Sequence, residues 1–307
     1  IWVYEKDTEQ SYLLTSGDLD SFSPLWSPDC KHIAYLSPIG DGANKKNQIF
    51  VQSIDGHPKV QLTDEDEGVS YFKWDPMGKG FFYLSPAKES EKIKKLKELY
   101  GDYHHIEKDY QNNCLYYKDM NPEKNVVKQL TSSDFHIHAF DISQDGTKVV
   151  LMATPTSNMS DYINGNLYVL DLQTSKLQKL RTEKLLGGSV CCFSPDGDKI
   201  CYTASIRDKD YYNNHIQDST IEIYDLLSEE IIQPIKDIDS TVTPIRWTEK
   251  GILIRWQHKT NYVMGLLSEN GTVEMLSEES FMMDPSITKD GNQIAYLKAA
   301  SNEIFEV

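Results

Sequence analysis

The stretch Phe193-Ser194-Pro195-Asp196-Gly197, followed after two residues by Ile200-Cys201-Tyr202-Thr203, decides the fold of this 307-residue chain. Proline fixes φ for a turn, aspartate hydrogen-bonds its own backbone, and glycine takes the positive φ that closes the turn. The apolar run after the turn has the composition of a returning strand. The stretch therefore predicts a β-hairpin.

This hairpin pattern occurs six times. The other five copies are Trp26-Ser27-Pro28-Asp29 before residues 33–36, Trp74–Gly78 before 81–84, Ile142–Gly146 before 149–152, a shortened Trp247–Gly251 before 252–254, and Ile287–Gly291 before 294–297. Counted at positions 28, 76, 144, 195, 249 and 289, the copies are 48, 68, 51, 54 and 40 residues apart. Propeller blades repeat every 40 to 50 residues or so, and all intervals but one fit that period.

Two further strand-like segments follow the hairpins, as in Gln48–Val51 with Val60–Thr63, Asn166–Val169 with Leu177–Leu180, and Thr220–Tyr224. Four short antiparallel strands per repeat predict an all-β fold, a β-propeller of four-stranded blades. Residues 1–15 supply only the last two strands of a blade, and residues 302–307 read as a third strand. We expect six hairpin units plus an N-terminal half-blade, hence six or seven blades. On this interpretation residues 1–307 form a single propeller domain that is a fragment of a longer protein.

The 68-residue interval contains one insertion, at about residues 86–103. Pro86 to Tyr100 lacks glycine and is rich in lysine and glutamate, and Ile93, Leu96 and Tyr100 recur at helical spacing. Gly101 follows as a helix cap. The insertion predicts a short surface helix resting on the propeller, with a lid or docking element as the alternative.

Composition excludes several classes of function. The formal charge is −16, with 47 acidic against 31 basic residues, which opposes binding to nucleic acid or to an anionic membrane surface. No apolar run approaches the roughly 20 residues that span a bilayer. Five cysteines lack a C-x-x-C pair; Cys192 and Cys201 could lie opposite each other on a hairpin, but free thiols in a reducing, cytoplasmic compartment are favoured. We expect no metal and no cofactor.

The chain resembles a known family in Ile1-Trp2-Val3-Tyr4, Trp26-Ser27-Pro28-Asp29, Lys97–Tyr103 and Asp109-Tyr110. These segments are similar to the N-terminal propeller of prolyl-oligopeptidase-family serine peptidases, in the acylaminoacyl- and dipeptidyl-peptidase branch. The hairpins also resemble those of Tol-associated propellers. The peptidase resemblance implies an α/β-hydrolase domain with a Ser-Asp-His triad outside this chain. The nearest approach to a G-x-S-x-G nucleophile motif is Gly187-Gly188-Ser189-Val190-Cys191, where cysteine replaces the second glycine, so we expect no catalytic residue.

The candidate substrate or channel residues are His136, His138, Asp109 and Tyr110. The histidines alternate on the strand that enters a blade, so both point to the same face, and first strands of blades line the central channel. Asp109 and Tyr110 end the acidic, aromatic insertion. Without an identified carboxylate the histidine pair is a weak metal candidate, and His104-His105 is expected to be solvated. The acidic pairs Asp66-Glu67 and Glu229-Glu230 could anchor a peptide amino terminus, although solvated surface charge is the default interpretation.

Three functions remain open. The first is a non-catalytic propeller that gates and selects short peptides for a serine peptidase, with the hydrolase domain and short peptides as partners. The second is a free-standing Tol-associated-type propeller that binds a protein or ligand as a scaffold. The third is a metal-dependent propeller hydrolase. A homo-oligomer is compatible with each of them, whereas nucleic acid and membrane are not expected as partners.

Overall fold

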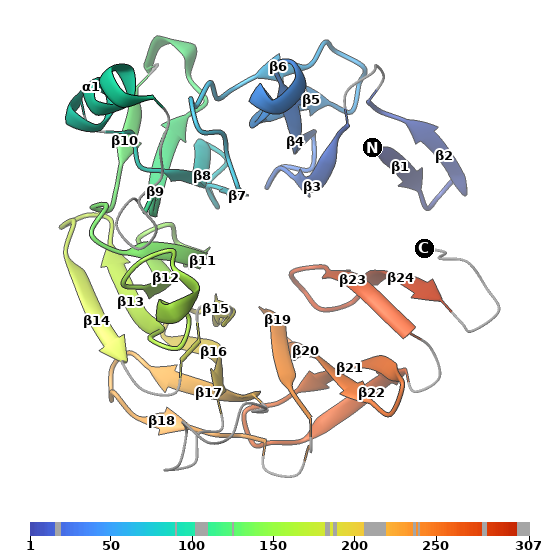
Figure 1. The fold of residues 1–307 in the computed structure, drawn as a ribbon. Coiled ribbons are helices and arrows are strands. Elements are labelled where there is room, and N and C mark those ends of the chain that lie inside the picture. Colours follow the sequence, from blue (N-terminus) through green and yellow to red (C-terminus); the bar gives the residue numbers. More distant parts are fainter. Residues whose placement is uncertain are drawn as a thin grey trace. The chain divides into compact units, whose positions relative to one another are not determined.

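The computed structural model describes residues 1–15, 20–89, 91–101, 110–124, 126–181, 185–186, 189–205, 219–235, 238, 240–277 and 281–299. The chain divides into two compact units, Ile1–His136 and Ile137–Val307. Each unit consists of successive antiparallel sheets (Figure 1). That the two units form the single domain expected for residues 1–307 stays a prediction.

The first unit contains one two-stranded and two four-stranded sheets. The two-stranded sheet comprises β1 (Trp2–Glu5) and β2 (Gln10–Leu13). The next sheet comprises β3 (Phe22–Trp26), β4 (His32–Ile39), β5 (Lys46–Ser53) and β6 (Val60–Gln61), with the 3₁₀ turn η1 (Gly42–Asn44) between β4 and β5. The third comprises β7 (Tyr71–Trp74), β8 (Gly80–Pro86), β9 (Asn113–Asp119) and β10 (Val127–Gln129), with helix α1 (Glu91–Tyr100) and the 3₁₀ turn η2 (Pro122–Lys124).

The sheets of the second unit begin with β11 (His136–Ile142), whose first residue lies at the unit boundary. Three four-stranded sheets and one two-stranded sheet follow each other along the chain. Their other elements are β12 (Lys148–Thr154), η3 (Met159–Asp161), β13 (Asn166–Asp171), β14 (Leu177–Arg181), β15 (Cys191–Phe193), β16 (Lys199–Ser205), β17 (Ser219–Asp225), β18 (Ile231–Ile232), β19 (Val242–Thr248), β20 (Gly251–His258), β21 (Asn261–Leu267), β22 (Val273–Ser277), β23 (Phe281–Ile287) and β24 (Ile294–Ala299).

The propeller fold is confirmed, but the expected count of six or seven blades is wrong. Among the described residues five sheets have four strands, each paired in chain order, whereas β1–β2 and β23–β24 are two-stranded. All six hairpin copies do form hairpins. The number of blades was overestimated because the turn motif marks only the first and second strands of a blade. The third and fourth strands carry no such motif, and residues 300–307 lie outside the described residues.

Four of the six hairpin turns share one hydrogen-bond network. At the copy quoted first, the Ser194 hydroxyl donates to Asp196 Oδ1 at 2.5 Å and accepts from the Lys199 amide at 2.9 Å. Asp196 Oδ1 also accepts from the Asp198 amide at 3.1 Å, and Gly197 has φ +77°. The serine bond holds the pKa of Asp196 below its usual value. A hydroxyl donated to an aspartate two residues later therefore fixes four of the six turns, at Ser27, Ser143, Ser194 and Thr288. The turns after Trp74 and Trp247 have Met77 and Lys250 in place of the aspartate.

The expected helix is confirmed as α1, which ends where the Gly101 amide donates to the Lys97 carbonyl at 2.9 Å with Gly101 at φ +82°. Leu96 is half-buried, but Tyr100 is 73% exposed although its spacing matched that of Leu96. The insertion as a whole was expected to reach residue 103, and residues 102–109 lie outside the described part. No helix in the described part is long and apolar enough to cross a membrane.

Each fourth strand of the first unit is followed by a leucine and a threonine that hydrogen-bond to one residue in, or next to, the third strand. After β6, the Leu62 amide donates to the Ile49 carbonyl and the Ile49 amide donates to Thr63 Oγ1, both at 2.8 Å. The same two bonds join Leu130 and Thr131 to Leu115, and Leu14 and Thr15 to Ile1. Their registers also agree, since Leu13 pairs with Trp2 as Gln61 pairs with Phe50 and Gln129 with Tyr116. The pair β1–β2 therefore corresponds to the third and fourth strands of a blade, as the sequence predicted.

The core consists of apolar side chains between successive sheets. In the first unit, Ala34, Leu36, Ile49 and Val51 of one sheet pack with Phe72, Trp74, Phe81, Cys114 and others of the next. In the second unit, the same layering buries Cys192 and Cys201. These two cysteines are direct cross-strand partners, as expected, and both are free thiols. Burial raises the pKa of Cys201, so its thiol is held in the unreactive protonated form.

Candidate functional site

The two candidate histidines lie on β11, the first strand of its blade. His136 and His138 are half-buried, whereas Ile137 between them is fully buried. This alternation places both histidines on the same face, as expected from the period of a strand. Each ring is held by a different hydrogen bond, and these bonds determine what the rings can do.

His138 is held as a neutral hydrogen-bond donor. Its Nε2 lies 2.8 Å from Thr154 Oγ1, and the Thr154 hydroxyl donates its own proton to the Thr156 carbonyl at 2.7 Å. Nε2 must therefore carry the proton of the His138–Thr154 bond. Burial lowers the pKa of His138, which also favours the neutral ring. Tyr162 meets the imidazole edge-on, with ring centroids 6.4 Å apart.

The loop after β12 fixes this arrangement. The Thr156 hydroxyl donates to Asp161 Oδ2 at 2.5 Å, and Asn158 Oδ1 accepts from the Ser160 amide at 3.2 Å at the start of η3. Thr154 is 1% exposed and its hydroxyl proton is already donated to a carbonyl. Thr154 is therefore unsuited to act as a nucleophile, and this group of residues favours a positioning role for His138 over acid–base chemistry.

His136, the last residue of the first unit, is held by strand β9 of that unit. Its Nδ1 accepts from the Asn113 amide, at the start of β9, at 3.0 Å. Nδ1 is thus the unprotonated nitrogen in this contact. Of the other two candidates, Tyr110 is half-buried in the segment just before β9, and Asp109 lies outside the described residues. The structure brings the two histidines to one strand face, and the grouping of all four residues stays a prediction.

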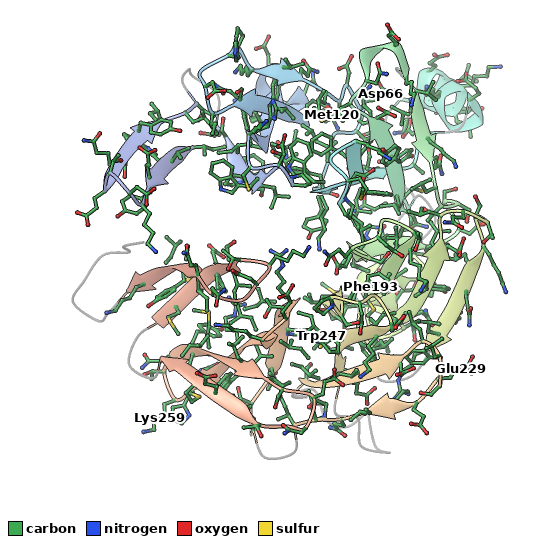
Figure 2. The ribbon with its side chains drawn as sticks, turned by 180° about the vertical axis from the view of Figure 1, so that it is seen from behind. Asp66, Met120, Phe193, Glu229, Trp247 and Lys259 are labelled. Carbon is green, nitrogen blue, oxygen red and sulfur yellow. The ribbon has the colours of Figure 1, made fainter. Side chains whose placement is uncertain are left out.

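The acidic pairs occupy different environments. Glu229-Glu230 lies in the exposed turn between β17 and β18, with Glu229 at φ +59° (Figure 2). Glu67 pairs with Lys46 Nζ at 3.0 Å, whereas its neighbour Asp66 is exposed. Within the described residues no three histidine, cysteine, aspartate or glutamate side chains are grouped to hold a metal ion.

Asp66 and Glu67 line a cavity of about 250 Å³ beside the start of helix α1. Its other lining residues are Glu65, Ser85, Pro86, Lys88, Glu89 and Lys94. Carboxylates and ammonium groups are mixed around this cavity, and Glu89 pairs with Lys97. The cavity therefore presents no single charge to a ligand.

Glu65, which the sequence analysis did not single out, is the buried anchor of this region. It is 8% exposed, its Oε1 accepts from the Tyr83 hydroxyl at 2.6 Å, and its carbonyl accepts from the Gln48 amide group at 2.8 Å. Burial, followed by the Glu65 bond, raises the pKa of Tyr83. The signal that could have found Glu65 is its place two residues after the repeated leucine–threonine pair.

A second hollow, of about 540 Å³, lies in the second unit. Its lining combines apolar side chains such as Trp256, Ile235 and Val273 with Asn270. Ser189, the serine of the near-miss nucleophile motif, accepts from the Leu186 amide at 3.2 Å and is 4% exposed. It precedes strand β15 rather than a helix, so this part of the chain lacks the strand–turn–helix of a nucleophile elbow.

The sequence comparison gives one curated relative and no family. No known family profile matches the chain. The chain is 36% identical over 94 residues to an uncharacterized peptidase, YuxL, of Bacillus subtilis (strain 168). That match takes in 30% of this chain and only 14% of the relative. The sequence predicted a resemblance to peptidases, and the similarity to this relative confirms that resemblance.

The fold comparison extends over nearly the whole chain. The acylaminoacyl peptidase of Pyrococcus horikoshii matches 99% of this chain with a TM-score of 0.70 and 14% identity, over 45% of its own length. TolB of Acinetobacter baumannii matches 89% of this chain with a TM-score of 0.59 and 16% identity, over 59% of its own length. The chain thus spans less than two thirds of each relative. At these identities the two structures establish the shared propeller fold.

Proposed function

We propose that this chain is the non-catalytic propeller of a serine peptidase of the acylaminoacyl- or dipeptidyl-peptidase type. The observation that carries the proposal is the coverage of the structural match. It takes in 99% of this chain but 45% of the acylaminoacyl peptidase, which leaves more than half of that enzyme without a counterpart here. The similarity to a curated peptidase supports the same assignment.

The propeller would act by steric selection. A blade wall in front of a hydrolase active site admits short, flexible peptides and excludes folded proteins, without making or breaking a bond. Neither candidate histidine has the bonding expected of a catalytic base, since His138 donates to Thr154 and His136 accepts from a backbone amide. The bond chemistry of the proposed enzyme therefore belongs to the hydrolase domain.

Charge would contribute to this selection. The formal charge of −16 attracts the protonated amino termini of oligopeptides over distances set by the Debye length, roughly 8 Å at physiological salt. Asp66 and the Glu229-Glu230 pair are exposed carboxylates that contribute to this field. On this proposal peptides with a free amino terminus are preferred at low salt, and the preference weakens as salt rises.

The test uses the chain alone and the longer protein. The purified 307-residue chain is expected to hydrolyse neither acyl-peptide nor dipeptidyl chromogenic substrates, and serine-inhibitor-sensitive turnover would contradict the proposal. The gene is expected to encode a G-x-S-x-G segment within roughly 250 residues, one domain length, downstream. With that segment expressed, removing residues 1–307 should relax the size limit so that longer peptides are cleaved.

A Tol-associated-type scaffold is the second candidate, favoured by the match of TolB to 89% of this chain. The two candidates differ in the gene. A stop codon shortly after the codon for Val307 supports the scaffold and removes the peptidase proposal. An in-frame hydrolase segment supports the peptidase proposal.

A further inference from the structure

Two cysteines stand opposite each other in the hairpin formed by β15 and β16. Cys192 of β15 pairs with Cys201 of β16 in the antiparallel register. Two pairs further along the ladder, the Ser194 amide donates to the Lys199 carbonyl at 2.9 Å. Because hydrogen-bonded pairs recur at every second residue, the two cysteines also occupy a hydrogen-bonded position, where opposite Cα atoms are about 5.5 Å apart. Disulfides join Cα atoms that are roughly 4.4–6.8 Å apart, so this backbone already has a suitable spacing.

The two thiols share one face of the sheet and are buried together. Cys192 is 5% exposed and Cys201 is fully buried, and both belong to one apolar cluster with side chains of β19 and β20 such as Ile254. Burial, followed by a hydrogen bond with the Cys192 side chain, raises the pKa of Cys201. Cys191 is buried as well, but it pairs with Tyr202 and belongs to a different cluster. The third cysteine of this hairpin is therefore directed away from the pair.

The packing of the repeat does not require two cysteines at this position. The corresponding cross-strand pairs of four other hairpins contain a variety of side chains and no sulfur: Leu25–Ala34, Lys73–Phe82, Arg246–Leu253 and Ser286–Ala295. Hairpins of this repeat therefore form with aliphatic, aromatic or charged residues at the same place. The pair Cys192–Cys201 adds a chemical property that the other hairpins lack.

We propose that Cys192 and Cys201 form a reversible redox site, which hydrogen peroxide converts into a cross-strand disulfide within one blade. The peroxide oxidises the Cys192 thiol to a sulfenic acid and is itself reduced to one molecule of water. The Cys201 sulfur then attacks the sulfenic sulfur and the S–S bond forms. The Cys201 proton leaves with the displaced hydroxide as a second molecule of water. Two thiols and one peroxide thus give one disulfide and two waters.

The exposure of the two side chains sets the order of these steps. Cys192 retains some solvent exposure, whereas Cys201 has none, so the oxidant reaches Cys192 first. The raised pKa of Cys201 also keeps that thiol protonated, and the protonated form reacts slowly with peroxide. Cys201 is therefore the resolving cysteine, and its burial beside Cys192 favours the disulfide over further oxidation of the sulfenic acid.

The register indicates a labile disulfide rather than a permanent one. Opposite Cβ atoms of an antiparallel pair are about 4.5–5.5 Å apart, and the wider spacing belongs to hydrogen-bonded positions. A disulfide needs a Cβ separation of about 3.8 Å, so the two strands must move together. β15 has three residues and is the shortest first strand in the described part of the chain, which makes this movement easier. Strained disulfides are more readily reduced than structural ones.

The test treats the folded, reduced chain with hydrogen peroxide in a Cys30→Gly background. Cys30 is exposed and would react independently, and its φ of +57° suits the glycine that other turns of the repeat have there. Free thiols titrated in denaturant should fall from four to two per chain. Trypsin cleaves after Lys199 and so separates the two cysteines. Without reductant, peptides 185–199 and 200–207 should appear linked, and dithiothreitol should release them.

Cys191→Ala is the matched control, because Cys191 is equally buried and lies in the same tryptic peptide as Cys192. This variant should keep the linked peptides, whereas Cys192→Ala and Cys201→Ala should each abolish them. The proposal is overturned if the thiol count stays at four, if the linked peptides contain Cys114, or if Cys191→Ala removes the link. A link that forms only in urea would overturn it too, because the folded chain would then not bring the two sulfurs together.

Discussion

The first unit contains two interfaces between successive sheets that use the same repeat positions differently. The first interface lies between β1–β2 and sheet β3–β6, and the second between sheets β3–β6 and β7–β10. Each stacks an aromatic pair from the second and third strands, Tyr35 on Phe50 at 5.9 Å and Tyr83 on Tyr116 at 5.5 Å. The Tyr83 hydroxyl bonds to Glu65, whereas the buried Tyr35 hydroxyl has no hydrogen-bond partner among the described residues, which leave out 16–19.

The sequence differs after the two equivalent threonines. Thr15 and Thr63 occupy equivalent positions in the repeat. Glu65 stands two residues after Thr63, whereas Gly17 stands two residues after Thr15. The two interfaces therefore share the aromatic stack, while within the described residues a carboxylate meets Tyr83 and none meets Tyr35. The comparison teaches that blades of one repeat can be equal in packing and unequal in hydrogen bonding.

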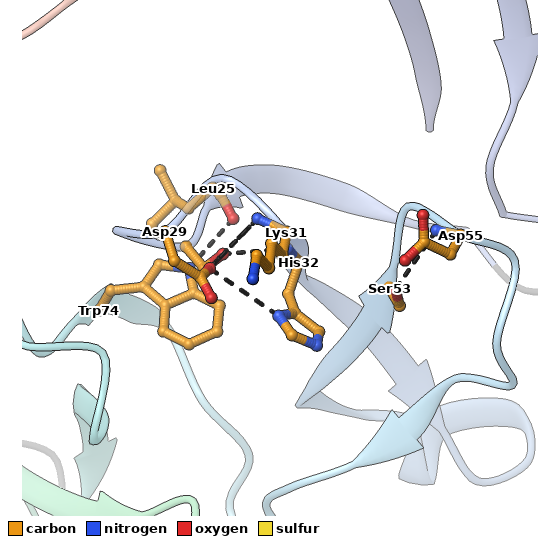
Figure 3. Close-up of polar contacts among 8 residues, drawn as sticks. Leu25, Asp29, Lys31, His32, Ser53, Asp55 and Trp74 are labelled. Atoms are coloured by element: carbon orange, nitrogen blue, oxygen red, sulfur yellow. Dashed lines mark hydrogen bonds and ion pairs between the residues drawn. The ribbon is translucent and has the colours of Figure 1, made fainter.

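The largest difference in unfolding free energy is expected between variants of Trp74 and of Trp26, which occupy the same repeat position. Trp74→Ala removes a buried indole whose ring centroid lies 4.1 Å from that of Phe81 and whose nitrogen donates to the Leu25 carbonyl (Figure 3). This change should cost about 3–5 kcal/mol of unfolding free energy. Trp26→Ala removes a ring that is 49% exposed, against 8% for Trp74, and should cost about 1 kcal/mol or less. Urea unfolding followed by circular dichroism measures both. Equal losses would mean that the two interfaces are equally complete.

The tyrosine hydroxyls give the next largest contrast. Tyr83→Phe leaves the buried Glu65 carboxylate without its hydroxyl donor, and we expect a loss of about 1–3 kcal/mol. Tyr35→Phe removes a hydroxyl that has no partner among the described residues, and the change should lie within about 1 kcal/mol of zero or stabilise the chain. Each variant is the other's matched control, because the same atom is deleted from the same repeat position. A reversed order would disprove the comparison.

The smallest effect is expected in the hairpin turns. The Ser27 hydroxyl donates to Asp29 at 2.6 Å and lowers the pKa of Asp29 below 3.8, whereas the equivalent position in the next hairpin is Met77. A depressed carboxyl pKa stabilises the folded chain above the unfolded value, and this contribution is lost as pH falls through the folded value. Asp29→Asn should therefore lower Tm slightly at pH 7.

The pH dependence provides the check on this third expectation. The stabilisation by Asp29 starts to fall below the pKa of an unfolded aspartate, about 3.9, and is gone below the lower pKa of folded Asp29. The Tm values of wild type and Asp29→Asn should therefore converge at low pH. Met77→Ala, at the equivalent place in a turn without this aspartate, should show a difference that does not change with pH. A constant difference for Asp29→Asn would show that the charge of Asp29 plays no part in the turn.

Much of the fold could be predicted from local chemistry. Turns such as Ser194–Gly197 are set by residues that contact their own neighbours, so hairpins and the short helix α1 could be placed from the sequence. The same locality explains why Ser189 could be placed before a propeller strand from the sequence. The four candidate channel residues had no such local signal, and only the shared strand face of His136 and His138 was recovered.

The sequence by itself determined the repeated hairpins, the half-blade at β1–β2 and the likeness to peptidase propellers, because these depend on turn chemistry and strand period. Only the tertiary structure decided how many blades are complete, which carboxylate meets Tyr83, and that Trp26 is exposed. Those properties depend on side chains brought together from different sheets, such as Glu65 with Tyr83 or Trp74 with Leu25. Burial and hydrogen-bond pairing across sheets are set by packing, and a linear motif does not record them.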